Sequence, residues 1–310
     1  MVDLTIYVPT YNRLMKLKNC LRAIRYDLKG YEDRVKVFVS NNGSTDGTKE
    51  YLEAQDWLEV RHNAENLGPA ANFLYAYNLP FESKFVWIIG DDDYVVPGSI
   101  GELLVLTNYD VDYIYCNTMA FNPDESGKVW EAYPEIPMGQ IKGKYEGIVE
   151  CKFADLIDPN VADTLLGELM VNCFRQEACR WDKPVENDET DARIRQAHNI
   201  PLIECFTKDT KSVYSQRPKT FNFWGTAEWL GDYDYVFPVI ILWLIREYRK
   251  FVSDEKYFAL LQYYADLMGG SITRQIEGKT KARPFNDAFK DVLNRTFEEY
   301  GSYRHSDSRQ

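Results

Sequence analysis

The sequence predicts an α/β protein in which a mostly parallel, doubly wound sheet carries helices on both faces and a helical C-terminal segment follows. Short apolar, β-branched runs alternate with stretches whose apolar residues recur at helical spacing through the first 118 residues. Strands that alternate with helices in this way favour a parallel sheet. Beyond about residue 221 the pattern becomes aromatic and helical, which predicts the helical segment.

The composition is typical of a globular protein with a sizeable core, with 45% hydrophobic and 27% charged residues. A formal net charge of −12 disfavours nucleic acid as a partner. Six scattered cysteines without a C-x-x-C pair indicate free thiols rather than a zinc site. No signal peptide is apparent, and the longest apolar run, Val236–Ile245, is about half the length of a membrane-spanning helix. We therefore expect a cytoplasmic protein.

The first strand is expected at residues 4–8, which are apolar and β-branched. Pro9 ends this strand, and Asn12 is suited to cap a helix over residues 14–24, where leucine and isoleucine recur at helical spacing. A second strand is expected at residues 35–39. This strand runs directly into a polar turn that contains two glycines.

The same alternation continues to about residue 118. Pro69 suits the first turn of a helix, where a missing N–H costs nothing. The elements expected here are a helix at 49–55, a strand at 58–61, a helix at 69–77, a strand at 85–89, a helix at 98–106 and a strand at 111–116.

The pattern loosens beyond residue 120. Residues 121–147 hold several prolines and glycines and are typical of a loop-rich insert. The later elements expected are a strand at 167–174, helices at 188–199, 235–248 and 257–268, and a disordered tail at 302–310.

Four polar clusters follow four of the expected strands. The carboxyl ends of parallel strands share one edge of the sheet, and ligands bind at that edge. The clusters would form the walls of a ligand cleft there. They are Pro9-Thr10-Tyr11-Asn12, Asn41-Asn42-Gly43-Ser44, Asn66-Leu67-Gly68 and Asp91-Asp92-Asp93.

The three adjacent aspartates Asp91–Asp93 repel one another unless a cation or donor compensates them. Oxygen ligands suit Mg²⁺ or Mn²⁺, which could bridge to a diphosphate. The alternative is a solvated loop that caps a helix.

The other clusters also allow two interpretations each. Tyr11 can stack on a nucleobase or pack at the rim of the sheet. Asn41 and Asn42 can read the polar edge of a base or simply form a turn. The segment 66–69 can offer N–H groups to a phosphate or only begin a helix.

Four segments, in order and at compatible spacing, resemble the family 2 glycosyltransferases with their type A nucleotide-sugar-binding fold. The resemblance extends to bacterial O-antigen and capsule sugar transferases, including abequosyltransferase-like members. It is strong over residues 3–118, moderate to about residue 215 and absent beyond. The four segments are Pro9–Arg13, Ser44–Thr48, Asn66–Asn72 and Gly90–Pro97.

The resemblance implies an inverting transfer of a sugar from a nucleotide diphosphate, with UDP as the first expectation, to a hydroxyl of a saccharide or lipid-linked acceptor in surface polysaccharide synthesis. A Mn²⁺ or Mg²⁺ ion would be held by Asp92 and Asp93. The donor would be bound by Pro9, Thr10, Tyr11, Arg13, Asn41, Asn42, Asn66, Gly68, Asn72, Asp91 and Asp92.

Two positions depart from the family pattern. Asn41 stands where members usually have an aspartate that reads the base, so the acceptor oxygen is kept and the charge is lost. Gly90 stands at the first position of the family's Asp-x-Asp, so the metal would be held by fewer protein oxygens.

The resemblance implies a catalytic base about a hundred positions after the metal motif, where family members place an aspartate just before a helix. An inverting displacement needs one carboxylate near the acceptor hydroxyl. The candidates are Asp191, Glu189 and Asp188, with Asp191 favoured over Glu189. The alternative is that these acids favour the positive end of a helix.

The resemblance divides the chain into a nucleotide-sugar-binding half (1–118), an acceptor-side half (119–215) and a helical extension (216–310). In the extension, Trp224 and Trp229 can stack on an acceptor sugar or belong to the core. Basic clusters at 246–250 and 279–283 can contact an anionic inner-membrane surface or be solvated helix faces. The C-terminal helices can also form a homodimer contact.

Two rival functions stay open at this point. A nucleotidyltransferase would share the sheet and the acidic site, but it usually needs a glycine-rich, basic loop after the first strand. Residues 9–12 do not fit such a loop. A non-catalytic binding module with a degenerate transferase fold is the second rival, and Asn41 and the unassigned base favour it.

Overall fold

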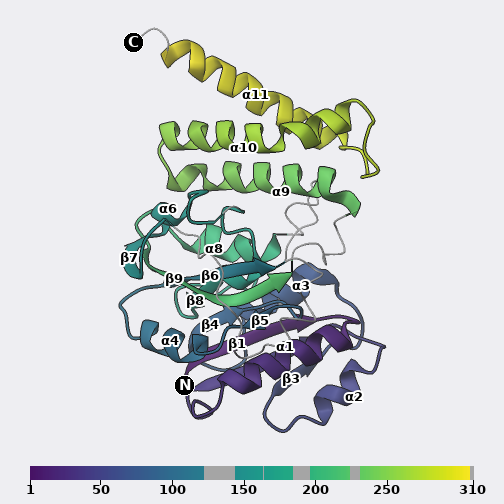
Figure 1. Cartoon of the computed structure of the whole chain (residues 1–310), viewed down its shortest axis with the longest axis vertical. Helices are drawn as coiled ribbons and strands as arrows, with labels where there is room; N and C mark the ends of the chain where they lie inside the picture. The colour runs from purple at the N-terminus through teal and green to yellow at the C-terminus, as the bar shows by residue number, and fades with distance from the viewer. Residues whose placement is uncertain (122–143, 163, 184–195, 224–230, 308–310) are drawn as a thin grey trace.

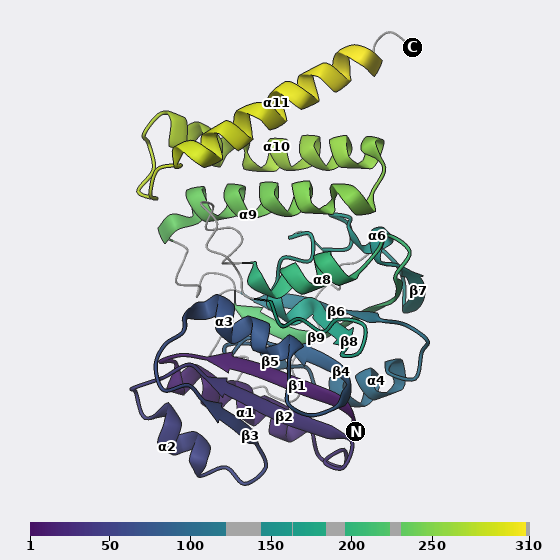
Figure 2. The ribbon, with the colours of Figure 1, turned by 180° about the vertical axis from the view of Figure 1, so that it is seen from behind.

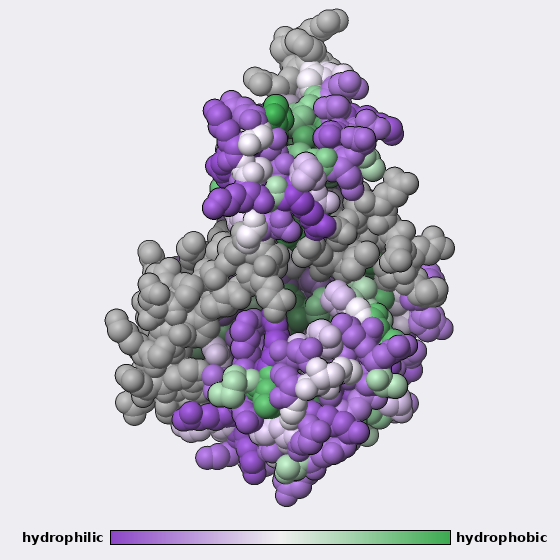
Figure 3. Space-filling view, turned by 90° about the vertical axis from the view of Figure 1, so that its right-hand side faces the viewer, coloured by the Kyte–Doolittle hydropathy of each residue, from purple (hydrophilic) through white to green (hydrophobic). Residues whose placement is uncertain are grey.

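The computed structural model describes residues 1–121, 144–162, 164–183, 196–223 and 231–307. A sheet with flanking helices forms one end of the molecule, and the long helices of the C-terminal segment are stacked at the other end (Figure 1). On the face seen in Figure 3, hydrophilic residues cover most of the described surface, and hydrophobic ones form only small spots. No helix within these ranges has both the length and the apolar character to cross a bilayer.

The described strands form one nine-stranded sheet in the order β3-β2-β1-β4-β8-β6-β9-β5, with β7 paired to β9. The strands are β1 (Val2–Thr10), β2 (Val35–Asn41), β3 (Glu59–His62), β4 (Ser83–Ile88), β5 (Tyr94–Val95), β6 (Tyr113–Phe121), β7 (Ile148–Lys152), β8 (Asn172–Arg175) and β9 (Lys211–Phe223).

The predicted α/β fold class is confirmed, with a mixed sheet in which β1 to β4 are parallel and β6 also pairs in parallel with β9. Strands β3, β2, β1 and β4 are all parallel. Strand β8 pairs antiparallel with both β4 and β6, and β9 pairs antiparallel with β5 and β7. The carboxyl ends of β1, β2 and β4 therefore share one edge, as the sequence predicted.

Helices cover both faces of the sheet: α1 and α4 lie on one side, and α3 and α8 on the other (Figures 1 and 2). The helices are α1 (Leu14–Asp27), α2 (Thr48–Glu53), α3 (Gly68–Leu74), α4 (Ser99–Leu106), α6 (Phe153–Leu156), α8 (Ile200–Cys205), α9 (Tyr233–Tyr248), α10 (Asp254–Ile276) and α11 (Asp287–Asp307).

Strands β1 and β4 form the centre of the core. Their side chains are buried on both faces of the sheet because helices cover both faces. Tyr7 and Trp87 are fully buried, and each polar atom has a partner, as buried donors require. The Tyr7 hydroxyl donates to the carbonyl of Asn72 at 2.5 Å. The Trp87 indole donates to the carbonyl of Met170 at 2.8 Å.

Two expectations were wrong in part, and a third lies mostly outside the described residues. The strand expected at 167–174 begins only at Asn172, after a 3-10 turn. The tail expected to be disordered is helical to Asp307. The helix expected at 188–199 lies outside the described residues except for its end, where Ala197–Asn199 form a 3-10 turn.

Strand β9 was not predicted, because its sequence reads as a polar loop interrupted by Pro218. The proline is tolerated since the register of β9 against β6 shifts between Cys116 and Thr118, and prolines inside sheets occur at such bulges. The boundaries expected at residues 118 and 215 fall inside β6 and β9. The division into three parts therefore stays a prediction.

The buried histidine His198 connects its own segment to the loop at Gly167. His198 is 3% exposed, and its Nε2 lies 3.1 Å from the carbonyl of Gly167, while Nδ1 has no partner among the described residues. The Tyr77 hydroxyl donates to the carbonyl of His198. Burial lowers the pKa of His198 to about 4, so the ring is neutral at physiological pH.

We predict that His198 makes the protein less stable in mild acid. The unfolded chain takes up this proton near the ordinary histidine pKa of about 6.5, whereas the folded chain does so only near 4. Stability that is present above pH 6.5 is therefore lost towards pH 4, by about 3 kcal/mol. In urea unfolding, His198→Gln should remove most of this slope. His62→Gln, at a partly exposed site, should change it less, and equal slopes in all three proteins would contradict the prediction.

Candidate active site

Two of the polar clusters are bonded into one surface at the edge of the sheet. The carbonyl oxygen of the Asn12 side chain accepts the N–H of Thr45 at 2.8 Å, and Ser44 Oγ accepts the N–H of Asn12 at 2.9 Å. Asp46 Oδ2 accepts the N–H of Leu14 at 2.9 Å. The expectation that Asn12 caps α1 was therefore wrong: Asn12 joins the loops, and the first N–H of α1 is satisfied by Asp46 from the neighbouring turn.

Asn42 holds the third cluster against the second. Its Nδ2 donates to Asn66 Oδ1 and to the carbonyl of Gly68, and its Oδ1 accepts from Asn63 Nδ2 and the N–H of Leu67. Four bonds use the full capacity of an amide, so Asn42 positions the loop. Asn66 is exposed and Gly68 is partly exposed.

The turn after β2 requires glycine at position 43. Gly43 has a φ of +72°, and a Cβ there would lie 2.6 Å from the backbone carbon of Glu65. The loops that follow β2 and β3 therefore approach each other backbone to backbone, which only glycine permits.

Asn41 and Asn72 also make their bonds inside the protein. Asn41 Oδ1 accepts the N–H of Ser44 at 3.1 Å, which identifies Nδ2 as the donor to His62 Nδ1 at 3.0 Å. Asn72 Oδ1 accepts from Ser40 Oγ at 2.6 Å. Tyr11, by contrast, is 42% exposed at the mouth of the edge, and Pro9 is buried in β1.

The three aspartates differ sharply in their surroundings. Asp91 is 4% exposed, and its carboxylate accepts from Thr10 Oγ1 at 2.7 Å and from Arg13 Nη1 at 3.0 Å. Asp92 is the partly exposed member, with its Oδ2 between Arg13 Nη1 at 3.2 Å and Lys16 Nζ at 3.3 Å. Arg13 thus bridges two of the three carboxylates from the start of α1.

Asp93 turns away from the edge, and Gly90 makes room for it. Asp93 is 3% exposed, and its Oδ2 accepts the N–H of Gly90 at 2.7 Å. A Cβ on residue 90 would lie 2.8 Å from this oxygen. An aspartate at position 90, as in the family pattern, would therefore force the carboxyl of Asp93 to move.

Burial shifts the pKa values of two of the three carboxylates. Burial and the neighbouring Asp92 raise the pKa of Asp91 to about 6, although Arg13 opposes the shift. Burial raises the pKa of Asp93 well above its usual range, which favours its protonated form. Two cations, Arg13 and Lys16, then face two carboxylates, those of Asp91 and Asp92.

A buried ion pair that the sequence did not reveal supports the loop after the aspartates. Lys219 of β9 is fully buried, and its Nζ lies 2.9 Å from Glu102 Oε1 on α4. Burial lowers the pKa of Lys219. Burial would by itself raise the pKa of Glu102, but Lys219, Ser215 and Arg217 together lower it. The pair links β9 to α4.

Five of the expected site residues lie outside the described residues. They are Asp188, Glu189 and Asp191, expected at the base, and Trp224 and Trp229, expected at the acceptor.

A divalent metal ion needs several oxygen, nitrogen or sulfur ligands around one point. The described residues contain no group of three or more histidine, cysteine, aspartate or glutamate side chains placed to hold a metal. Asp92 is the accessible carboxylate of the three, because Asp91 and Asp93 are buried and engaged. This fits an ion such as Mg²⁺ that is held by one protein carboxylate together with substrate phosphates and water.

Comparisons with known proteins agree with this geometry. The family model described as "Glycosyl transferase family 2" matches residues 5–158, which include every cluster described above. The abequosyltransferase RfbV of Salmonella typhimurium is 32% identical over 117 residues, which cover 36% of this chain and 34% of that protein. The match thus spans about a third of that relative.

Solved structures share the fold at low sequence identity. S. aureus TarS 1–349 in complex with UDP-GlcNAc has a TM-score of 0.57 at 14% identity, over 84% of this chain and 70% of that chain. The mannosyltransferase PcManGT from Pyrobaculum calidifontis, in complex with GDP-Man and Mn²⁺, has a TM-score of 0.52 at 14% identity, over 98% and 82%.

We predict that Arg13 and Lys16 contribute unequally to stability. Arg13→Gln leaves the buried Asp91 without its cation and should lower the free energy of unfolding by about 1–3 kcal/mol at neutral pH. Lys16→Gln, a matched loss of one charge at a more exposed pair, should cost under about 1 kcal/mol. The Arg13→Gln cost should shrink as pH falls below about 6, where Asp91 is protonated. A cost that is independent of pH in chemical unfolding would refute this account.

Proposed function

The chain belongs to glycosyl transferase family 2, and we propose that it is an inverting enzyme that moves a sugar from a nucleotide diphosphate to a hydroxyl of a saccharide or lipid-linked saccharide. The observation that supports the proposal is the hydrogen-bonded cluster of polar side chains at the carboxyl edge of the sheet. Arg13, Thr10 and the aspartates are brought together from β1, α1 and β4. We expect the reaction to serve bacterial surface polysaccharide synthesis at the cytoplasmic side of the membrane.

The donor would bind across the ends of β1 and β2. Tyr11, exposed at the mouth of this edge, would stack on the base, an interaction worth about 1–3 kcal/mol per base. UDP is our first expectation, supported by the TarS complex with UDP. GDP, dTDP and CDP are the alternatives, and the PcManGT complex with GDP-Man supports the first of these.

The charge balance of the site supports a divalent ion. Arg13 and Lys16 are already paired with Asp91 and Asp92, so a bound diphosphate would add negative charge that these two cations do not offset. Mn²⁺ or Mg²⁺ held by Asp92 would neutralise the diphosphate and stabilise the leaving nucleotide. The inward position of Asp93 supports Asp92 as the principal ligand and leaves Asp93 as support for the loop.

The base and the acceptor site rest on residues 184–195 and 224–230, which are outside the described structure. We propose Asp191 as the base, with Glu189 and then Asp188 as alternatives, and Trp224 and Trp229 as acceptor contacts. A homodimer through the C-terminal helices is supported by Tyr263 and Leu267, which are exposed one turn apart on α10.

Thermal stability measurements test the donor and the metal. The protein should gain thermal stability with one of UDP, dTDP, GDP and CDP in the presence of Mn²⁺, because a ligand at a hundred times its Kd adds about 2.7 kcal/mol. Most of this shift should vanish with EDTA. Asp92→Asn should fold, and it should lose the Mn²⁺-dependent part of the shift together with transfer.

Lys16→Gln is the control for Asp92→Asn, since it removes the partner of the same carboxylate and keeps the expected ligand. It should retain the Mn²⁺-dependent shift. A full shift in Asp92→Asn would remove this residue from the metal site. Nucleotide binding without transfer to any acceptor of a broad panel would favour a degenerate binding module.

Substitutions of the candidate carboxylates test the assignment of the base. Asp191→Asn should lower kcat by about 10²–10⁴-fold, the usual contribution of a general base, and leave the nucleotide-dependent thermal shift unchanged. Glu189→Gln should have a much smaller effect. Equal and mild losses in both variants would mean that neither carboxylate is the base, and the reverse order would assign the role to Glu189.

A further inference from the structure

Basic residues at the two ends of the molecule differ in whether they are already neutralised. The C-terminal clusters pair internally: Arg249 with Asp254 and Glu299, and Lys279 with Glu277. Arg283 pairs with Asp232. Three of the six basic residues in these clusters are thus paired with carboxylates.

The outer face of α1 is a second basic surface. Lys18, Arg22 and Arg25 are spaced by four and three residues, which places them on one side of α1, and Lys29 follows in the turn after the helix. Within the described ranges, Lys18, Arg25 and Lys29 have no carboxylate at ion-pair distance, although Lys36 and Lys49 elsewhere on the surface do. This positive face lies at the end of the molecule opposite to α9–α11 (Figure 1).

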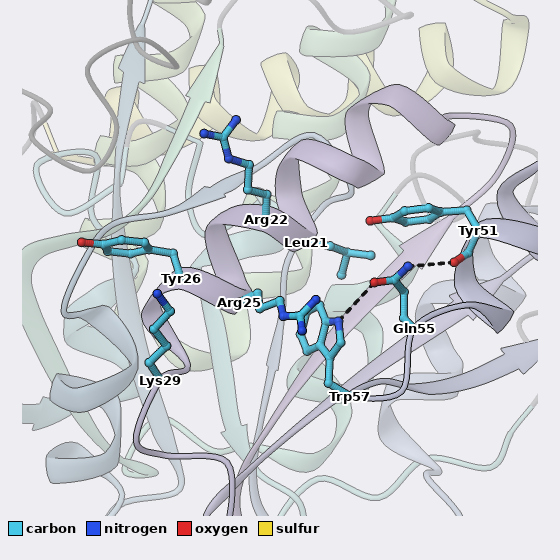
Figure 4. A pocket seen from close by; sticks show the side chains of 8 residues that line it. All are labelled: Leu21, Arg22, Arg25, Tyr26, Lys29, Tyr51, Gln55 and Trp57. Carbon is cyan, nitrogen blue, oxygen red and sulfur yellow. Dashed lines mark hydrogen bonds between the residues drawn. The ribbon is translucent and has the colours of Figure 1, made fainter.

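A pocket of about 460 Å³ opens on this face between α1 and the end of α2. Figure 4 shows its side chains, and none of the eight is acidic. The lining consists of Leu21, Arg22, Arg25, Tyr26, Lys29, Tyr51, Gln55 and Trp57.

Aromatic rings hold the cations of the pocket in place. The Arg25 guanidinium lies over the Trp57 ring, 5.4 Å from its centroid, and both side chains are visible together in Figure 4. Lys29 Nζ lies 5.2 Å from the ring centroid of Tyr26, and Lys18 Nζ lies 5.0 Å from that of Tyr51. Such contacts position a cation while leaving its N–H groups free for an oxyanion.

We propose that this face, comprising Lys18, Arg22, Arg25 and Lys29 with the pocket they border, docks the protein on an anionic lipid surface, with lipid phosphate groups in the pocket. Each Lys or Arg close to such a surface adds about fivefold to binding. Tyr and Trp suit the same location because their rings favour the boundary between water and lipid. The proposal does not depend on the transfer reaction.

The net charge of −12 does not prevent this docking. At physiological ionic strength, charges more than about 8 Å from the lipid surface are largely screened. The attraction to the lipid therefore depends on the local charge of the docking face. Helix α1 also connects this face to the candidate active site, since Arg13 precedes its first residue. Arg25 is 12 residues further along, a distance of about 18 Å at the rise of an α-helix.

The test is co-sedimentation of the full chain with vesicles of phosphatidylcholine alone and vesicles that also contain phosphatidylglycerol. The wild type should bind the anionic vesicles more strongly, and added salt should weaken this binding. Arg25→Gln/Lys29→Gln should bind them about thirtyfold less strongly. Asp56→Asn, which removes a carboxylate next to Trp57, should bind more strongly.

The matched control is Arg180→Gln/Lys208→Gln, which removes two exposed cations elsewhere and should bind as the wild type does. All variants should keep the wild-type melting temperature and nucleotide-dependent shift, which separates docking from donor binding. Equal binding to both vesicle types, or wild-type binding by Arg25→Gln/Lys29→Gln, would overturn the proposal. So would a pocket that binds inorganic phosphate or glycerol phosphate but not the anionic vesicles.

Discussion

The site depends on keeping three consecutive carboxylates at the end of one buried strand. Their mutual repulsion is relieved in three different ways. Asp91 is bonded to Thr10 and Arg13, Asp92 is shared by Arg13 and Lys16, and Asp93 turns inward to the N–H of Gly90. The partners come from β1, from the first turn of α1 and from the loop itself. The bonds of this cluster therefore hold β1, α1 and the end of β4 in fixed positions relative to one another.

The surrounding loops hold this arrangement by bonding to one another rather than to solvent. Asn12, Asn42 and Asp46 bond across two or three loops, and the side chain of Tyr11 remains exposed beside them. A nucleotide would thus meet a preformed edge, with little loop ordering left to oppose its binding. Asp92 is the more exposed of the three carboxylates and pairs with Arg13 and Lys16.

The parallel half of the fold could be predicted because each of its strands is a short apolar run between helices with clear periodicity. The four clusters at its edge followed from the same pattern. Individual roles within the clusters could not be predicted, since Asn42 and Asp93 look available in the sequence and are engaged in the structure. Strand β9 and the Glu102–Lys219 pair were missed because their signal is the pairing of residues far apart in the sequence.

The position of β9 in the sheet also sets the order in which the protein can mature. Strand β5, directly after the aspartates, has its partner in residues 220–221, and the N–H of Val96 bonds to the carbonyl of Lys219. A chain emerging from the ribosome can form β1 to β4 long before these residues exist. Its acidic loop lacks that support until β9 arrives, and such distant pairings form slowly. The nascent protein should therefore acquire its parallel core first and a competent nucleotide-binding edge only near the end of synthesis.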